Sequence, residues 1–319
     1  MVSKDFLNIQ KRFLSFADIH YGYLQQLFYQ KTMAEYFAQI IQNEKQVDGI
    51  LVPGDLLFYL SKYPDKRYFE ALKRDFNYLV SSLSAPVFIS YGNHDVLLSK
   101  ENLAKEKWDL KYFLDDRNNG VYVLDNEQVQ IGDMTITGFS PKRDAYNTSY
   151  MPHKALDMAY QDFQQCGFAF PNNHLNVLLS HENKFFTYPE IAQKYGDLYQ
   201  NLTLIVGGHL HDGYVPIALQ KMFPKQIKDL GIWEMIPPNI DMCRGLFKVS
   251  NSSTSEVYLP DFEHPTCVEL KEGESASIIN RGVAKYSWFI YGRPSYSLID
   301  VHGQSNSYEE QGYDRKRLK

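Results

Sequence analysis

The sequence is poor in cysteine, and its few cysteines do not form the pattern of a disulfide framework. Cys166, Cys243 and Cys267 are odd in number, lie far apart and include no Cys-x-x-Cys pair. Disulfide-stapled domains normally carry an even set of closely spaced cysteines. We therefore expect no disulfide framework and a protein of a reducing compartment, most simply the cytoplasm.

Long hydrophobic runs are also missing. The longest apolar stretches, such as 50–52 and 202–206, are far shorter than the ~20 residues that a membrane-spanning helix needs. Charges at Lys4, Asp5 and Lys11 interrupt any apolar stretch near the beginning of the chain. We expect neither a transmembrane segment nor a signal peptide.

The chain has no excess of positive charge and little glycine or proline. Its 33 Lys and Arg against 38 Asp and Glu give a formal net charge of -5, so the chain-wide basic footprint of a nucleic-acid-binding protein is absent, although a local patch could exist. With 19 Gly and 14 Pro in 319 residues, collagen-like and low-complexity chains are excluded. The 44% of apolar residues predicts a globular protein with a substantial core.

The order of apolar patterns in the first hundred residues predicts alternating strands and helices. Short apolar runs, each stopped by Gly, Pro or Asp, predict buried strands, and apolar residues at helical spacing predict helices between them. Strand–helix–strand succession is typical of a parallel sheet. We expect strands at 13–17, 48–52 and 86–91, with helices over 22–44 and after Pro64.

The rest of the chain has a different pattern. Short, closely spaced runs at 121–124, 129–131 and 134–137 predict neighbouring antiparallel strands. We also expect a helix over 154–166 and strands at 175–179, 202–206, 276–279 and 296–301. No linker divides the chain, so we expect one domain over 1–302, an irregular elaboration at 214–275 and a disordered tail at 303–319.

Clusters of Asp, Asn and His directly follow five of the predicted strands. Ligands of open α/β sheets bind outside the carboxyl ends of the strands, so clusters at these positions are expected to converge. Any one of them is a common chance pattern, whereas five in succession are not. They are Asp18-Ile19-His20, Gly54-Asp55, Gly92-Asn93-His94-Asp95, Ser180-His181 and Gly208-His209-Leu210-His211.

The residue types in these clusters fit divalent transition metals. Carboxylate and amide oxygens together with imidazole nitrogens suit Mn, Fe or Zn, and the sequence does not choose among them. Seven candidate ligands are too many for one ion and suit two ions if one carboxylate bridges. They are Asp18, His20, Asp55, Asn93, His181, His209 and His211.

This succession of motifs resembles the calcineurin-like metallophosphoesterase superfamily over 18–211. The resemblance implies an α/β fold in which two packed mixed β-sheets are flanked by helices, with the metals at one edge. A looser similarity, in Arg244-Gly245-Leu246-Phe247, Asn280-Arg281-Gly282 and Arg293-Pro294-Ser295, is to a bacterial subgroup often associated with membranes.

The resemblance also implies roles for the clustered residues. One metal would take Asp18, His20 and His211, the other Asn93, His181 and His209, and Asp55 would bridge them. His94 would bind the phosphate and protonate the leaving group, and Asp95 would orient the ring of His94. The implied reaction is hydrolysis of a phosphomonoester, phosphodiester or pyrophosphate by a bridging hydroxide on two divalent ions, with Mn as our first expectation.

Two other functions stay open from the sequence. A catalytically inactive binding or scaffold protein could keep the same fold, although loss of chemistry should break the ligand set and all seven ligand types are present. A nuclease is disfavoured by the net charge of -5. We expect a phosphorylated small-molecule or lipid-linked substrate and make no prediction of the oligomeric state.

Overall fold

The computed structural model describes most of the two predicted sheets and the helices beside them. The described residues are 10–20, 33–57, 66–95, 110–141, 152–182, 201–208, 245–248, 256–257, 266–270, 276–280 and 296–302. His209 and His211 lie outside them, as do the start of the helix predicted over 22–44, most of the elaboration at 214–275 and the tail at 303–319.

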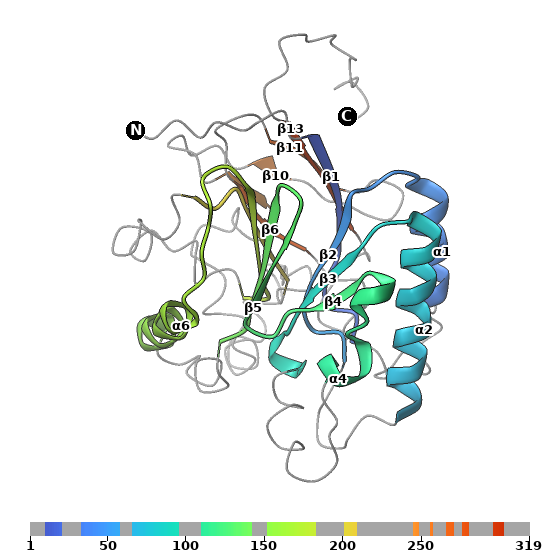
Figure 1. Ribbon diagram of the computed structural model, residues 1–319, viewed down its shortest axis with the longest axis horizontal. Coiled ribbons are helices and arrows are strands. Elements are labelled where there is room, and N and C mark those ends of the chain that lie inside the picture. The colour runs from blue at the N-terminus through green and yellow to red at the C-terminus, as the bar shows by residue number, and fades with distance from the viewer. Residues whose placement is uncertain are drawn as a thin grey trace, which may run out of the picture.

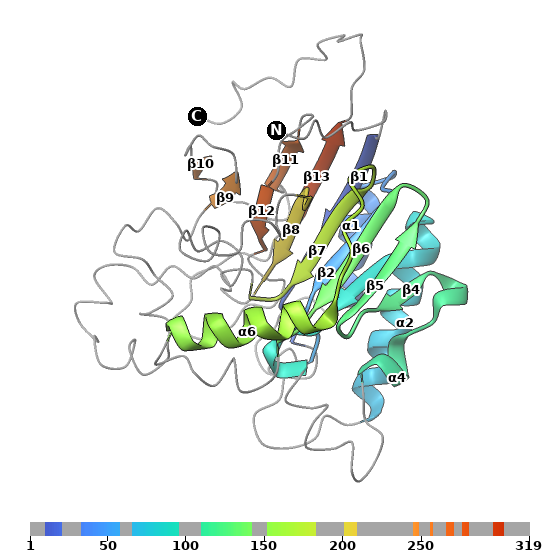
Figure 2. The same ribbon diagram turned by 60° about the vertical axis from the view of Figure 1, so that its left-hand side comes forward.

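Two mixed β-sheets pack face to face (Figures 1 and 2). In sheet order, the six-stranded sheet contains β11 (Thr266–Leu270), β13 (Ser297–His302), β1 (Gln10–Ser15), β2 (Gly49–Pro53), β3 (Val87–Ser90) and β4 (Val121–Val123). The seven-stranded sheet contains β10 (Glu256–Val257), β9 (Gly245–Lys248), β12 (Ala276–Ile279), β8 (Leu204–Gly207), β7 (Leu175–Ser180), β6 (Met134–Phe139) and β5 (Glu127–Ile131).

Helices cover the outer face of each sheet. On the first sheet lie α1 (Met33–Asn43), α2 (Lys66–Leu83) and the short α4 (Leu110–Leu114), which is followed by a 3-10 turn at Arg117–Asn119 (Figure 1). On the second sheet lies α6 (Pro152–Cys166), as Figure 2 shows. The predicted α/β sandwich of two mixed sheets flanked by helices is confirmed.

Alternation along the strands explains why the sheets are buried on both faces. In β2, Ile50 and Val52 pack against the helices, whereas Leu51 between them packs in the core between the sheets. Phe88 likewise faces the inter-sheet core, because successive side chains of a strand point to opposite faces. A strand that is apolar on both faces reads as a continuous apolar run, which is how these strands appear in the sequence.

The prediction of neighbouring antiparallel strands at 121–137 is wrong for the first of them. β5 and β6 are antiparallel partners, but β4 pairs in parallel with β3 in the other sheet. The chain changes sheets between Val123 and Glu127, where Asn126 has a left-handed φ of 52°. The Asn126 side chain accepts a hydrogen bond from the backbone of Ser140 (2.9 Å) and fixes this crossing.

The other elements that the sequence predicted match their described positions to within a few residues, whereas α4 and the strands β9, β10 and β11 had no predicted bounds. β1, β2, β3 and β4 are parallel neighbours, and so are β6, β7, β8 and β12. Parallel neighbours end at the same edge of a sheet, so the loops after them meet there. None of the helices in the described part of the chain is long and apolar enough to cross a membrane.

Candidate metal centre

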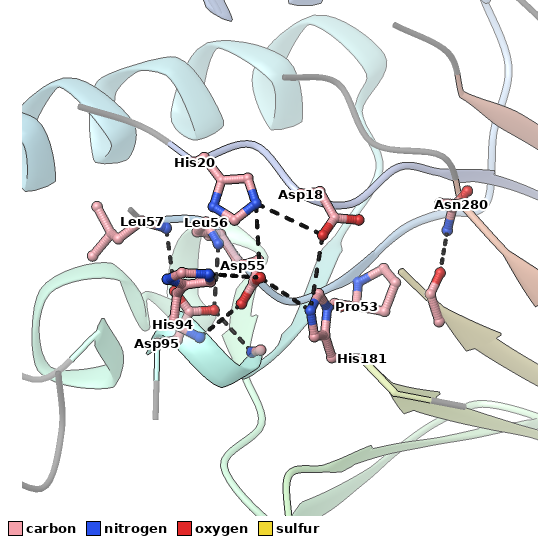
Figure 3. Close-up of polar contacts among 12 residues, drawn as sticks. Asp18, His20, Pro53, Asp55, Leu56, Leu57, His94, Asp95, His181 and Asn280 are labelled. Carbon is pink, nitrogen blue, oxygen red and sulfur yellow. Dashed lines mark hydrogen bonds and ion pairs between the residues drawn. The ribbon is translucent and has the colours of Figure 1, made fainter. Parts of the chain in front are cut away.

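Four of the five polar clusters place described side chains at one edge where the two sheets meet. Asp18 and His20 follow β1, Asp55 follows β2, and His181 follows β7 of the other sheet. The exposed fractions of these four side chains are 0–1%. Figure 3 shows Asp55 at the centre of the group, with the other side chains pointing toward it. The sequence therefore brings together residues up to 163 positions apart (18 to 181) in one buried polar site.

The loops that carry these side chains are backbone-strained. Asp18, His20 and Asp55 have φ values of 53°, 46° and 54°, in the left-handed region that residues other than glycine seldom adopt. Two backbone hydrogen bonds hold this arrangement, from Asp18 N to Gly54 O (3.2 Å) and from His20 N to Asp55 O (3.0 Å). Strain of this kind persists where surrounding contacts fix it and is concentrated at functional sites.

Close backbone packing around Asp55 and Asp18 requires two glycines. A Cβ atom on Gly92 would lie 2.0 Å from Asp55 Oδ1, and one on Gly208 would lie 2.6 Å from Asp18 Oδ2. Gly54 instead combines a φ of 85° with a backbone contact that excludes any side chain. The glycines before the clusters thus serve mainly to let other loops approach the carboxylates, and only Gly54 is needed for its turn.

We expect Gly92→Ala to weaken metal binding by displacing the Asp55 carboxylate. The added Cβ should cost about 1–3 kcal/mol of stability and reduce Mn²⁺ affinity about 10- to 100-fold. Gly132→Ala is the matched control, because Gly132 has a φ of 59° and nothing within 4 Å of its Cβ position, so only its backbone strain of about 1–2 kcal/mol applies. Thermal melting and calorimetric Mn²⁺ titration measure both effects. Equal Mn²⁺ affinity in the two variants would contradict the placement of Asp55.

The second carboxylate oxygen of Asp55 faces three imidazoles. Asp55 Oδ1 accepts the backbone N–H of His94 (2.9 Å), which turns Oδ2 inward. Oδ2 lies 3.1 Å from His181 Nε2, 3.7 Å from His20 Nε2 and 4.0 Å from His94 Nε2. It is buried, and it accepts no hydrogen bond within the described residues. A buried carboxylate oxygen surrounded by imidazole nitrogens is a position that a cation would satisfy.

The ring of His181 is also oriented toward the position that a cation would occupy. His181 Nδ1 donates a hydrogen bond to the carbonyl of Pro53 (2.8 Å), which leaves Nε2 directed at Asp55. A backbone carbonyl on the far nitrogen is the usual support of a metal-binding histidine. Asp18 Oδ1 lies 3.8 Å from both His181 Nε2 and His20 Nε2, so Asp18 stands between the two rings.

The electrostatics of the site favour positive charge. Burial alone would raise the pKa of Asp55, but His181, followed by His94 and His20, holds that pKa well below its usual range. Burial would lower the pKa of His181, but Asp55 and then Asp18 raise it to about 10. Two buried carboxylates thus stabilise a cation at the place where the imidazoles face them.

Two overlapping groups of these residues could hold metal ions. His20, Asp55 and His94 form one, and Asp18, Asp55 and His181 form the other, with the ligand atoms of each group within 4.8 Å of one another. Asp55 belongs to both. The carboxylate and imidazole donors, together with the buried Oδ2 of Asp55, fit divalent transition metals.

Asp95 joins the two loops on either side of the site. Its Oδ2 accepts backbone N–H groups of Gly92 (2.9 Å) and Leu56 (3.3 Å), and its Oδ1 accepts that of Leu57 (3.2 Å). Burial and then the charge of Asp55 raise the pKa of Asp95 to about 7. The carboxylate therefore fixes the loop that carries Asn93 and His94, and its predicted effect on the His94 ring stays a prediction.

The remaining predicted residues differ in accessibility. Asn93 is half-buried beside His94, whose side chain has an exposed fraction of 21% and whose ring meets that of His20 edge to face. His209 and His211 lie outside the described residues, just after Gly208. Sequence reasoning gave no site role to Asn280, a buried residue that directly follows β12 and bonds to Ser15, three residues before Asp18. Its position directly after a strand was the available signal.

Comparison with known proteins gives a family match that spans all of the strand-end clusters. The calcineurin-like phosphoesterase family model matches residues 11–213. Among solved structures, a dimetal phosphatase from Danio rerio is 14% identical, with 63% of this chain and 82% of that chain covered and a TM-score of 0.33. A protein of unknown function from Aquifex aeolicus is also 14% identical, with 63% and 79% covered and a TM-score of 0.27. No curated protein matches the chain.

Proposed function

The chain belongs to the calcineurin-like phosphoesterase family, and from that premise we propose that it hydrolyses a phosphomonoester, phosphodiester or pyrophosphate with two divalent metal ions. The observation that carries the proposal is the position of Asp55, whose buried carboxylate belongs to both candidate metal-binding groups. A carboxylate shared by two groups is the feature that a two-metal site requires and a one-metal site does not.

We propose the ligands that the sequence motifs imply. Asp18, His20 and His211 would hold one ion, Asn93, His181 and His209 the other, and Asp55 would bridge them. The closeness of Asp18, His20 and His181 to Asp55 supports the bridging role of Asp55, whereas the two candidate groups join Asp18 with His181 and His20 with His94 and so do not follow the proposed division between the ions. A bound pair of such ions supplies a nucleophile from water near neutral pH and neutralises charge on the phosphate. Mn is the ion we expect first, with Fe or Zn as alternatives.

His94 is the proposed general acid. Its ring is the most accessible of the three imidazoles around Asp55, so it can reach a bound substrate. Its backbone N–H donates to Asp55 Oδ1, and Asp95 holds its loop through the N–H of Gly92, so the backbone from which the ring extends is fixed. A proton on His94 would pass to the leaving oxygen of the ester, which otherwise departs as an alkoxide.

The substrate and setting are also part of the proposal. We propose a phosphorylated small molecule or a lipid-linked substrate, with the cytoplasm as the location that the cysteine content favours. The similarity to a bacterial subgroup often associated with membranes makes lipid-linked pyrophosphates a class to include in testing. The scaffold and nuclease alternatives correspond to no hydrolysis at all and to hydrolysis of nucleic acid.

We expect purified protein loaded with Mn²⁺ to carry two ions per chain, because seven candidate ligands with a shared carboxylate exceed the needs of one site. Elemental analysis gives the metal content. A panel of phosphomonoesters, phosphodiesters, lipid-linked pyrophosphates and single-stranded DNA, assayed with and without Mn²⁺, gives the activity. A reproducible ceiling of one ion would contradict the bridged pair, and two ions without any hydrolysis would favour the scaffold alternative.

A further inference from the structure

A buried hydrogen-bond network joins the two sheets beside the candidate metal centre. Its hub is Asn280, 2% exposed, which directly follows β12 of the second sheet. Its Nδ2 donates to Ser15 Oγ of β1 (2.8 Å) and to the Gly207 carbonyl of β8 (3.2 Å). Its Oδ1 accepts from Ser297 Oγ of β13 (3.0 Å). One side chain therefore connects four strands, two from each sheet.

Every polar atom of the Asn280 side-chain amide has a hydrogen-bond partner. Both Nδ2 hydrogens have acceptors, and the backbone N–H of Asn280 donates to the same Gly207 carbonyl (2.8 Å). Ser15 Oγ extends the hydrogen-bond network by donating to Leu51 O of β2 (3.0 Å). A fully satisfied buried network is rigid, and it specifies one arrangement of the groups that it joins.

The hydrogen bonds of Asn280 reach Gly207, whose neighbour Gly208 contacts the residues of the site. Gly207 is followed by Gly208, whose N–H donates to the carbonyl of His181 (2.8 Å). Gly208 packs against Asp18 so closely that a Cβ would lie 2.6 Å from Asp18 Oδ2. Ser15, the other partner of Asn280, lies three residues before Asp18 in the same segment. The side chain of Asn280 thus sets the spacing between the ends of β1 and β8.

We infer that Asn280 is a positioning residue of the proposed metal centre, which holds Asp18 and His181 at the separation that two ions need. The inference rests on the proposed two-metal function and adds to it a residue that bonds to none of the proposed ligand side chains within the described part of the chain. Its effect passes through the backbone of Gly207 and Gly208.

The chain contains a matched control in Asn176, which is also buried (1%) and also donates two hydrogen bonds from Nδ2, to Pro171 O (2.8 Å) and Asn201 O (2.9 Å). Asn176 lies near the start of β7, five residues and about 16 Å before His181. Loss of either side chain removes two buried donor bonds, and loss of Asn280 also removes the bond from Ser297 Oγ. Of these two side chains, Asn280 is the one whose bonds within the described residues lead to the site.

The experiment compares Asn280→Ala with Asn176→Ala in the full chain. Melting temperatures without metal should fall in both variants, and further in Asn280→Ala, which also loses the bond from Ser297 Oγ. Calorimetric titration with Mn²⁺ should show about 10-fold weaker binding in Asn280→Ala, the lower end of the range for residues that support metal ligands, and binding close to wild type in Asn176→Ala. At saturating Mn²⁺, kcat should fall in Asn280→Ala with a smaller change in KM, because the substrate contacts are intact.

Wild-type Mn²⁺ affinity in a folded Asn280→Ala would overturn the inference, and so would equal weakening in Asn176→Ala. If Asn280→Ala does not fold, Ser297→Ala decides, because it removes only the bond to Oδ1: weaker Mn²⁺ binding supports the inference and unchanged binding overturns it. If Asn280→Ala binds Mn²⁺ more weakly but the wild type hydrolyses no ester, the proposed function is wrong and the positioning role of Asn280 stands. If the wild type hydrolyses an ester but Asn280→Ala binds Mn²⁺ as tightly as the wild type, the proposed function stands and the positioning role is wrong.

Discussion

Replacement of Asp55 by asparagine is expected to remove metal binding and hydrolysis together. The substitution keeps the shape of the side chain, and a carbonyl oxygen can still accept the N–H of His94. In place of the inward Oδ2, however, it puts an NH₂ group or a neutral oxygen opposite His181 and His20, where the proposed bridge would bind both ions. We expect Mn²⁺ affinity and kcat each to fall at least about 100-fold. Loss of a residue that only hydrogen-bonds to a metal ligand costs up to about that factor, and loss of a bridging ligand should cost no less.

Asparagine is a sharper test than alanine at this position. Asp55 has a φ of 54°, and asparagine tolerates left-handed backbone, whereas alanine would add strain of about 1–2 kcal/mol. Asp75→Asn is the matched control, because Asp75 is also a buried carboxylate (3%) but lies in α2 and bonds to Arg74. Elemental analysis and turnover of p-nitrophenyl phosphate measure the two losses. Two retained ions with normal turnover in Asp55→Asn would exclude Asp55 as the bridge.

Most of the candidate site could be predicted because its residues depend on local features. Asp18, Asp55 and His181 lie within three residues of the ends of strands whose apolar runs are plain in the sequence. The parallel order of β1 and β2 then brings their carboxyl ends together, and the packing of the second sheet adds the end of β7. The residue type at each end is visible in the sequence, so the nature of the site follows from position and chemistry alone.

The place of β4 could not be predicted in the same way. The three short runs at 121–137 have similar lengths and spacing, and neighbouring strands in sequence usually pair. The crossing to the second sheet depends on the turn at Asn126 and on Gly138, where a Cβ would lie 2.3 Å from the carbonyl of Leu124. Such a contact between distant backbones leaves no periodic pattern in the sequence.

Long-range hydrogen bonds explain why the contacts of Asn280 and Asp95 could not be predicted from the sequence. Asn280 bonds to Ser15, 265 residues away, and Asp95 bonds to Leu56 and Leu57, 39 and 38 residues away. In both cases the residue type is polar and directly follows a strand or a motif, which predicts that it matters. Which groups it contacts depends on how the sheets pack, and that arrangement is a property of the whole fold. The roles of Asn280 and Asp95 therefore needed the structure.

Replacement of His94 by alanine is expected to slow the chemistry while the metals stay bound. The proposed role of His94 is to protonate the leaving oxygen, and general acid catalysis is typically worth about 10²- to 10⁴-fold. His174→Ala is the control, because the His174 ring bonds to Thr135 Oγ1 (2.9 Å) at the start of β6 and β7, away from the site. Elemental analysis should give wild-type metal content for both variants.

The leaving group decides between the possible roles of His94. The rate loss in His94→Ala should be large for alkyl phosphates, whose leaving oxygen needs a proton, and small for p-nitrophenyl phosphate, whose leaving group departs as a stable anion. Equal slowing of both substrates would mean that His94 binds phosphate and does not act as the acid. Loss of the metals would mean that His94 is a ligand, as its position with His20 and Asp55 in one candidate group permits. That result would replace the general acid with a third imidazole donor at the Asp55 bridge.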